Sequence, residues 1–325
     1  MPSETRADAM AGLNARSLAA RPWVQPGYRY RPASQHDQAG HDFRGTHPYF
    51  GWTHVQVDEI DLTMFSSNDD GVAMVYHAFG PDAYEAASVA AWLAIAKHSA
   101  AVADVGSFTG LFGILAQVAA PNASVIAIEP NPAVRARLFM NLVANGCYPK
   151  LKVAPYAVSN ALGTLSLHVA WGPDILDTGS SLNAPQNRPD WLPIRTEIVT
   201  AAPLDVILAE HGFAKLDLIK IDVEGVEAMA LAGARKTLAA QPTLFLEVQG
   251  HENFAACYAI LAAHGYRVSA IDDENLRLIP YEGSSAAEWF SENVGARVMN
   301  YLCVARSEHE EMVRHGLARI QAKIR

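Results

Sequence analysis

Residues 104–110 read DVGSFTG and separate one apolar run, AAVA at 100–103, from a second, LFGILAQVAA at 111–120. Gly106 and Gly110 allow backbone angles that other residues avoid, so the stretch predicts a tight turn between a strand and a helix. Such a turn either packs a helix closely onto a strand or points backbone N–H groups at an anionic part of a ligand. The stretch alone does not decide between a packing turn and a cofactor-binding turn.

Strand-like and helix-like segments alternate after residue 85, which predicts right-handed βαβ units and a mostly parallel sheet with helices on both faces. Helices are expected at residues 85–99, 111–120, 133–145, 204–212, 226–240, 255–265 and 308–325. Strands are expected at residues 101–105, 124–129, 152–158, 164–170, 216–222, 243–248, 266–272 and 298–306. The helix at 133–145 has marked ends, because Asn131 can cap it and Pro132 suits its first turn. The sequence therefore predicts an α/β fold.

The first 80 residues differ in composition from the rest of the chain. A short helix is expected up to Ala20, and a segment rich in proline, glycine, aromatic residues and histidine then predicts an irregular arm. The histidines of this arm have no spacing typical of metal ligands: His36, His41, His47 and His54. The chain is thus divided into an arm at 1–80, an α/β domain at 81–306 and a C-terminal helix at 307–325.

Exposed aromatic side chains need a surface to pack on. The arm carries several, and the long loop at 171–195 carries Trp171 and Trp191. We expect the arm and this loop to form a lid over the site, with a homodimer contact as the alternative for the arm.

Composition limits the partners that this chain can have. Half of its 325 residues are apolar, and its formal net charge is −9, which argues against nucleic acid as a partner. No apolar run approaches the roughly 20 residues that span a bilayer, and the N-terminus lacks the apolar core of a secretory signal. The three cysteines lie far apart and form no metal-binding or disulfide pattern. A cytoplasmic protein without a membrane partner is expected.

Acidic side chains stand at the carboxyl ends of four expected strands: Asp104, Glu129, Asp222 and Glu247. Buried carboxylates are costly, so four at one edge of a sheet are unlikely to gather there by chance. Ligands of open α/β sheets bind at this edge. We therefore expect the functional site beyond these strand ends, together with Gly106, Tyr156, Ala157 and Glu224.

The acidic residues and the glycine spacing separate two nucleoside cofactors. Glu129 follows the second strand, where an acid can bind both ribose hydroxyls of NAD or of S-adenosylmethionine. A dinucleotide turn favours a second glycine where this chain has Ser107, and Asp104 would repel a pyrophosphate. S-adenosylmethionine, which carries a sulfonium and an ammonium group, is the better fit.

Seven blocks of the sequence, taken in order, resemble the FkbM-type family of S-adenosylmethionine-dependent methyltransferases between about Tyr84 and Arg306. They are DVGSFTG, VIAIEPNP, LFMNLVANG, AVSNALGTLSL, DLIKIDVEGVEAMALAGA, LFLEV and NYLCV. The resemblance implies a Rossmann-like class I methyltransferase fold with a central seven-stranded sheet. The family usually has an alanine-asparagine pair in the first glycine turn, where this chain has Ser107 and Phe108.

The resemblance also implies which residues bind the cofactor. Those expected around its methionine end are Asp104, Gly106, Ser107, Phe108, Gly110 and Asp222. Those expected around its adenosine are Glu129, Pro130, Asn131, Tyr156 and Ala157. Asn131 has an alternative role as a helix cap, which we favour.

Methyl transfer to a hydroxyl needs in-line positioning and a base that removes the proton. The candidate catalytic residues are Asp222, Glu247 and His251, with Asp222 the best placed. Asp222 and Glu247 together could hold Mg²⁺, but no third ligand is evident, so a metal is not favoured. The expected activity is O-methylation of a hydroxyl on a sugar, polyketide or other natural product. The alternatives are a nicotinamide-dependent oxidoreductase and a non-catalytic cofactor-binding partner protein.

Overall fold

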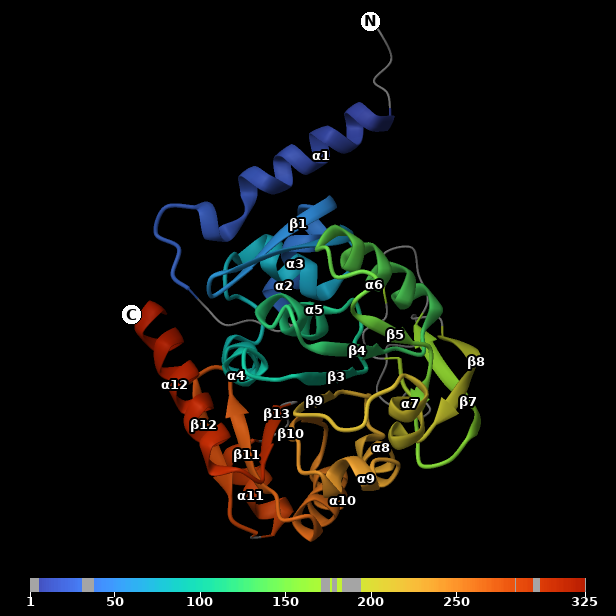
Figure 1. The fold of residues 1–325 in the computed structure, drawn as a ribbon. Coiled ribbons are helices and arrows are strands. Elements are labelled where there is room, and N and C mark those ends of the chain that lie inside the picture. Colours follow the sequence, from blue (N-terminus) through green and yellow to red (C-terminus); the bar gives the residue numbers. More distant parts are fainter. Residues whose placement is uncertain are drawn as a thin grey trace, which may run out of the picture.

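A computed structural model describes residues 6–30, 38–170, 176, 180–182, 194–283, 285–294 and 299–324. Its central sheet has eight strands in the order β12-β11-β13-β10-β9-β3-β4-β5 (Figure 1). Their bounds are β3 Ala101–Val105, β4 Ser124–Ile128, β5 Lys152–Ala154, β9 Leu218–Ile221, β10 Thr243–Val248, β11 Arg267–Asp272, β12 Arg277–Tyr281 and β13 Met299–Val304. Strands β5, β4, β3, β9 and β10 pair in parallel, whereas β13 runs antiparallel between β10 and β11. This confirms the expected mostly parallel α/β sheet.

Two departures from the expected strands lie at the two edges of the central sheet. The eighth strand, β12, pairs antiparallel with β11 at the sheet edge and was not expected from the sequence. The segment expected as one strand at 152–158 is divided into β5 and β6 (Ala157–Val158), because Pro155 between them has no N–H for a ladder. Strand β6 joins β8 (Ile194–Ala202) and β7 (Gly163–Ala170) in a separate three-stranded sheet.

Helices cover both faces of the central sheet (Figure 1). On one face lie α4 (Ala86–Ala96), α5 (Leu111–Ala119) and α6 (Pro132–Ala144), and on the other α7 (Leu204–Glu210), α8 (Glu227–Ala232), α9 (Arg235–Ala239) and α10 (His251–Ala263). Helix α11 spans Ala286–Asn293, and the C-terminal helix α12 (Ser307–Ile324) packs against α4. No helix among the described residues is both long and apolar enough to cross a bilayer.

The helix expected at 226–240 is interrupted at Gly233. A Cβ at this position would lie 2.0 Å from the backbone oxygen of Ser159, so the chain passes another backbone segment too closely for a side chain. The helix consequently ends at Ala232 and α9 begins two residues beyond the glycine.

The arm is more regular than its composition indicates. After α1 (Arg6–Ala20), a short 3₁₀ turn (Pro22–Val24) and α2 (Gln38–Thr46), the chain forms a hairpin of β1 (Phe50–Val57) and β2 (Ile60–Ser67), followed by α3 (Gly71–Phe79). The expectation of an irregular segment was therefore wrong for α2 as well as for residues 50–79. Every second residue of each strand is buried, as the two-residue period of a strand predicts. These buried residues, which include Val55, Leu62 and Met64, face the same core as α4 and α5.

Three polar side chains at four-residue spacing, two on α6 and one at its C-cap, bind the unpaired edge of β2. Arg137 donates to the carbonyl of Phe65, Asn141 accepts from the N–H of Phe65, and Asn145 both accepts from and donates to the backbone of Thr63. Residues four apart lie on one face of a helix, so the three side chains satisfy the edge of the strand. The hairpin is thereby joined to the α/β domain.

Candidate functional site

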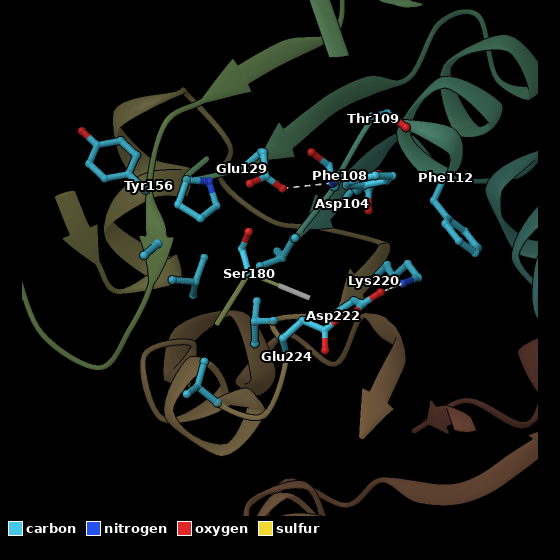
Figure 2. Close-up of a pocket in the computed structure, with 18 of the residues that line it drawn as sticks. Asp104, Phe108, Thr109, Phe112, Glu129, Tyr156, Ser180, Lys220, Asp222 and Glu224 are labelled. Atoms are coloured by element: carbon cyan, nitrogen blue, oxygen red, sulfur yellow. Dashed lines mark hydrogen bonds and ion pairs between the residues drawn. The ribbon is translucent and has the colours of Figure 1, made fainter. Parts of the chain in front are cut away.

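A pocket lies at the carboxyl ends of β3, β4 and β9 (Figure 2). It is lined by most of the residues that the sequence analysis assigned to the cofactor: Asp104, Gly106, Ser107, Phe108, Glu129, Pro130, Tyr156, Ala157 and Asp222. The parallel strands bring these residues together because their carboxyl ends meet at one edge of the sheet.

The glycine turn after β3 lies in close backbone contact with the end of β9. Gly106 has a φ of +75°, and a Cβ there would lie 1.6 Å from the backbone oxygen of Asp222. The turn therefore packs directly on the end of β9, which brings its backbone beside Asp222. Gly110 serves helix packing, since a Cβ there would lie 2.4 Å from Leu138 Cδ1 and Gly110 does not line the pocket.

Glu129 organises the turn from the neighbouring strand. Its two carboxylate oxygens accept the N–H groups of Asn131 (2.8 Å) and Phe108 (3.1 Å, dashed in Figure 2). Burial raises the pKa of this carboxyl to about 7, against the opposing effect of the two N–H groups. Each carboxylate oxygen has further acceptor capacity, so Glu129 can also bind hydroxyl groups of a ligand.

One buried hydroxyl group in the turn, Ser107 Oγ, has no hydrogen-bond partner among the described residues, and Ser107 lines the pocket. Buried polar atoms are seldom left unpaired, so this hydroxyl fits a pocket that binds a polar ligand.

Lys220 is a buried cation at the other side of the pocket. It belongs to β9, is 3 % exposed, and its Nζ lies 2.5 Å from Asp222 Oδ2. The ammonium group also lies 4.7 Å from the centre of the Phe112 ring. Sequence reasoning missed Lys220, although a lysine within the apolar strand LIKI was a usable signal.

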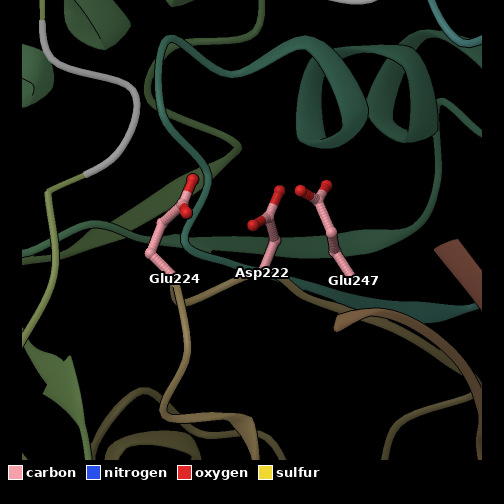
Figure 3. Close-up of side chains that lie close together, drawn as sticks. All are labelled: Asp222, Glu224 and Glu247. Atoms are coloured by element: carbon pink, nitrogen blue, oxygen red, sulfur yellow. The ribbon is translucent and has the colours of Figure 1, made fainter. Parts of the chain in front are cut away.

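Asp104 and three carboxyl groups from the end of β9 and from β10 complete the polar part of the site. Asp104 Oδ2 accepts the N–H of Gly113, and burial raises the pKa of the Asp104 carboxyl to about 6. Oxygens of Asp222, Glu224 and Glu247 lie within 4.8 Å of one another (Figure 3). Glu224 thus supplies the third carboxylate that the sequence analysis lacked for Mg²⁺. Lys220 already pairs with Asp222, however, and the preference against a metal stays a prediction.

Some candidate residues lie apart from the pocket lining. His251 is the first residue of α10, and its exposed ring packs edge-on against Phe290. Glu247 lies beside Asp222 but does not line the pocket. Asn131 caps α6 by accepting the N–H of Ala133, as favoured from the sequence, and also donates to Ser180 Oγ.

A short part of the 171–195 loop crosses the pocket. Ser180 and Leu182 line it, and Ser181 donates to the backbone oxygen of Glu224 over 2.6 Å. Trp171 and Trp191 lie outside the described residues, as does His36 in the arm. The described aromatic residues of the arm do not line the pocket. Several contact α3 and its end instead: Trp23, Tyr28, Phe43 and Tyr49.

Other lining residues were not expected from the sequence: Val72, Tyr84, Thr109, Phe112, Leu167, Ser180, Leu182 and Val226. Val72 lies in the first turn of α3 and Tyr84 precedes α4, so both come before the sequence blocks that resemble known methyltransferases. No local pattern marks these two residues, because only the packing of distant segments brings them to the strand ends, whereas Thr109 and Val226 lie within the blocks.

The family model of the methyltransferase FkbM domain matches residues 100–268, just over half of the chain. The protein belongs to this family. The match confirms the family that the sequence resemblance implied.

Curated relatives of this FkbM protein include two bacterial enzymes. It is 27 % identical over 139 residues to 2-O-methyltransferase NoeI of Sinorhizobium fredii, a match covering 41 % of the chain and 56 % of NoeI. It is 29 % identical over 210 residues to AMB antimetabolite synthetase AmbE of Pseudomonas aeruginosa, covering 54 % of the chain and 10 % of AmbE. The matches thus span about half of NoeI and a small part of AmbE.

Solved structures similar to this FkbM protein include two O-methyltransferases. The enzyme from Bacillus cereus, in complex with SAH, has a TM-score of 0.40 and 9 % identity over 68 % of this chain and 80 % of its own. TomG from Streptomyces achromogenes, in complex with SAM, has a TM-score of 0.38 and 10 % identity over 67 % and 78 %.

Proposed function

We propose that this protein transfers a methyl group from S-adenosylmethionine (SAM) to a hydroxyl group of a small molecule such as a sugar or another natural product. The observation that carries this proposal is the position of Asp222, which lines the pocket next to the glycine turn and is held by Lys220. A carboxylate at this point can accept the proton of a hydroxyl group. The similarity to NoeI, a 2-O-methyltransferase, supports the same reaction class.

The residues of the pocket divide between the two ligands. Glu129 and Tyr156 lie at the side of the pocket assigned to adenosine, whereas Asp104, Ser107 and Thr109 lie at the turn that would hold the amino-acid end. Bound SAM supplies an electrophilic methyl group. The chain must hold the acceptor oxygen in line with it at about 3 Å, and Ser180 and Leu182 help to exclude water by crossing the pocket.

The acceptor hydroxyl gives its proton to Asp222 as the new carbon–oxygen bond forms and the carbon–sulfur bond breaks. Asp222 needs only its oxygen Oδ1 for this step, because Oδ2 is occupied by Lys220. Glu247, whose oxygen lies within 4.8 Å of Asp222, is placed to receive the proton afterwards. His251 stays the least supported of the three candidate bases, since its exposed ring packs against Phe290.

The test is an assay of methyl transfer to a panel of hydroxylated acceptors, in which the rate of S-adenosylhomocysteine (SAH) formation is measured. Asp222→Asn keeps the shape and removes the charge, so we expect SAM binding to persist and kcat to fall at least a hundredfold. The matched control is Asp61→Asn, which removes an exposed carboxylate paired with His54 and should leave kcat unchanged. Near-normal kcat in Asp222→Asn would assign the base elsewhere, and absence of SAM binding in the wild type would overturn the proposed function.

A chelator distinguishes a role of Asp222 as the general base from a role as a metal ligand. If Asp222 acts as the base, activity should persist in excess EDTA. A loss that Mg²⁺ restores would instead assign Asp222, Glu224 and Glu247 as metal ligands. A nicotinamide-dependent oxidoreductase would bind NAD in place of SAM, and a non-catalytic partner protein would bind SAM without turnover with any acceptor.

A further inference from the structure

A row of polar side chains crosses the buried face of the sheet under α4 and α5. Asp104 on β3 lies directly opposite Lys220 on β9, and Glu247 on β10 lies directly opposite Asn300 on β13. Each is less than a tenth exposed. These four residues, called the polar row below, occupy the same face as the apolar core that includes Phe245. Charged groups are rarely retained in such surroundings without a partner or a ligand.

Glu85 joins the polar row from outside the sheet and outside the family match at residues 100–268. It immediately precedes α4 and has a left-handed φ of +40°, a conformation that costs energy in a residue other than glycine. Its Oε2 accepts the side-chain amide of Asn300 over 2.9 Å. Burial raises the pKa of the Glu85 carboxyl to about 7, partly offset by the positive charge of Lys220.

The charges around Lys220 do not balance. Its ammonium group interacts with four carboxyl groups, those of Asp222, Glu247, Glu85 and Asp104, and they raise the pKa of Lys220 despite its burial. One cation lies among four carboxyl groups, so ionisation of more than one of them leaves an excess of negative charge in a region of low dielectric constant. Such a cluster gains stability either by binding protons or by binding a cationic ligand.

We propose that Glu85, acting with Lys220 and the rest of the polar row, makes the pocket select the cationic sulfonium form of the cofactor over its neutral thioether product. The inference rests on the proposed function, because it requires that the pocket bind SAM. SAM and SAH differ by the methyl group and the positive charge on sulfur. Each carboxyl group of this cluster that is ionised therefore stabilises SAM relative to SAH, and methyl transfer removes the positive charge on sulfur.

The consequence is an order of events. Loss of the sulfonium charge leaves the carboxylates without a counter-charge at the moment when the acceptor releases a proton. The polar row then binds that proton more readily than before, and SAH leaves more easily than SAM. Glu85 acts through the field of the cluster rather than by contact, so it is a positioning residue and not a catalytic one.

The experiment measures the affinities of SAM and SAH by calorimetry in the absence of an acceptor. Glu85→Gln keeps the size of the side chain and an oxygen for Asn300 while removing one charge. We expect the ratio of SAM to SAH affinity to fall about tenfold. The reason is that Glu85→Gln removes the Coulomb attraction between one carboxylate and the sulfonium group, screened by an intermediate dielectric constant. Asp61→Asn, which removes one exposed charge, should leave this ratio unchanged.

The wild type provides a second measurement in case Glu85→Gln does not fold. The groups that face Glu85 are Lys220, Asp222, Glu247, Asp273 and Tyr84. Burial raises the pKa of the Glu85, Glu247 and Asp273 carboxyl groups, so raising the pH from 6 to 8 removes protons from them and the ratio of SAM to SAH affinity should increase. The amino-acid group common to both ligands cancels in the ratio.

The outcomes distinguish this inference from the proposed function. If both ligands bind and the ratio is the same in Glu85→Gln and across this pH range, charge selection by Glu85 is wrong while the methyltransferase site stands. If neither ligand binds to the wild type, the proposed function fails.

Discussion

The side-chain amide of Asn141 donates to the backbone carbonyl of Thr109 over 2.9 Å, which ties helix α6 to the glycine turn after β3. The same side chain accepts the N–H of Phe65 on β2. Asn141 is fully buried, so one residue joins the N-terminal hairpin, α6 and the turn.

Replacing Asn141 by alanine should therefore destabilise the protein. The change leaves one N–H and one carbonyl unpaired in the interior and opens a small cavity, for a cost of about 2–4 kcal/mol. Urea denaturation measures the loss. Met140→Ala on the same helix, at a side chain 41 % exposed, should cost much less. Equal losses in the two variants would contradict the bridging role of Asn141.

Gly106→Ala should abolish cofactor binding. The new Cβ would meet the backbone of Asp222 at 1.6 Å, and the φ of +75° disfavours any side chain. Calorimetry with SAH measures the effect. The control is Gly163→Ala, where no atom lies within 4 Å of the added Cβ. Retained SAH affinity in Gly106→Ala would mean that the turn does not form the pocket.

Glu129→Ala should weaken SAM binding at least tenfold. Hydrogen bonds to a charged group contribute about 1.5–3 kcal/mol each, and the variant also frees the N–H groups of Phe108 and Asn131. Binding of adenosine alone should weaken as well, since the contact expected is to the ribose. An affinity for SAM equal to that of the wild type would exclude Glu129 as the ribose ligand.

Removing residues 1–75 should prevent cooperative folding. The deletion takes away the β1–β2 hairpin and the start of α3, whose buried residues share a core with α4 and α5. Loss of several fully buried side chains exceeds the stability of a typical domain. Thermal unfolding followed by circular dichroism tests this. A cooperative transition with intact SAM binding would show that the hairpin is dispensable.

The ligand-free protein should lose stability as the pH rises from 6.5 to 8. A carboxyl group whose pKa is higher in the folded than in the unfolded state stabilises the fold at low pH, and this contribution disappears as the pH rises through the folded pKa. Burial places the pKa of Glu129 at about 7, so this residue alone should cost about 1 kcal/mol over the interval.

His77 works in the opposite direction but at lower pH. Burial lowers its pKa to about 4, so it destabilises the fold only as the pH falls below about 6.5. Melting temperatures at pH 6.5, 7.2 and 8 measure the carboxyl effect separately. Stability that is constant or rises over these values would contradict the assigned shift of Glu129.

The sequence by itself determined the α/β fold and the edge of the sheet that carries the site. Apolar runs such as 101–105 and 243–248 have the composition and length of buried strands, and the glycine turn and acids at their ends follow directly in the sequence. These signals are local. Asp104, Glu129 and Asp222 could be placed in one pocket because parallel strands bring their carboxyl ends together.

Only the tertiary structure decided which distant groups complete that pocket. Lys220 lies within an apolar strand and was missed from the sequence. Its charge is paired with Asp222, two residues later, and interacts with Glu85, which precedes the segment matched by the family model. Contacts that the sequence does not show also give Gly110 a packing role against Leu138 and Asn131 a capping role at the first turn of α6. A local pattern records the preferences of the backbone, whereas burial and charge at a residue depend on neighbours that are far away in the chain.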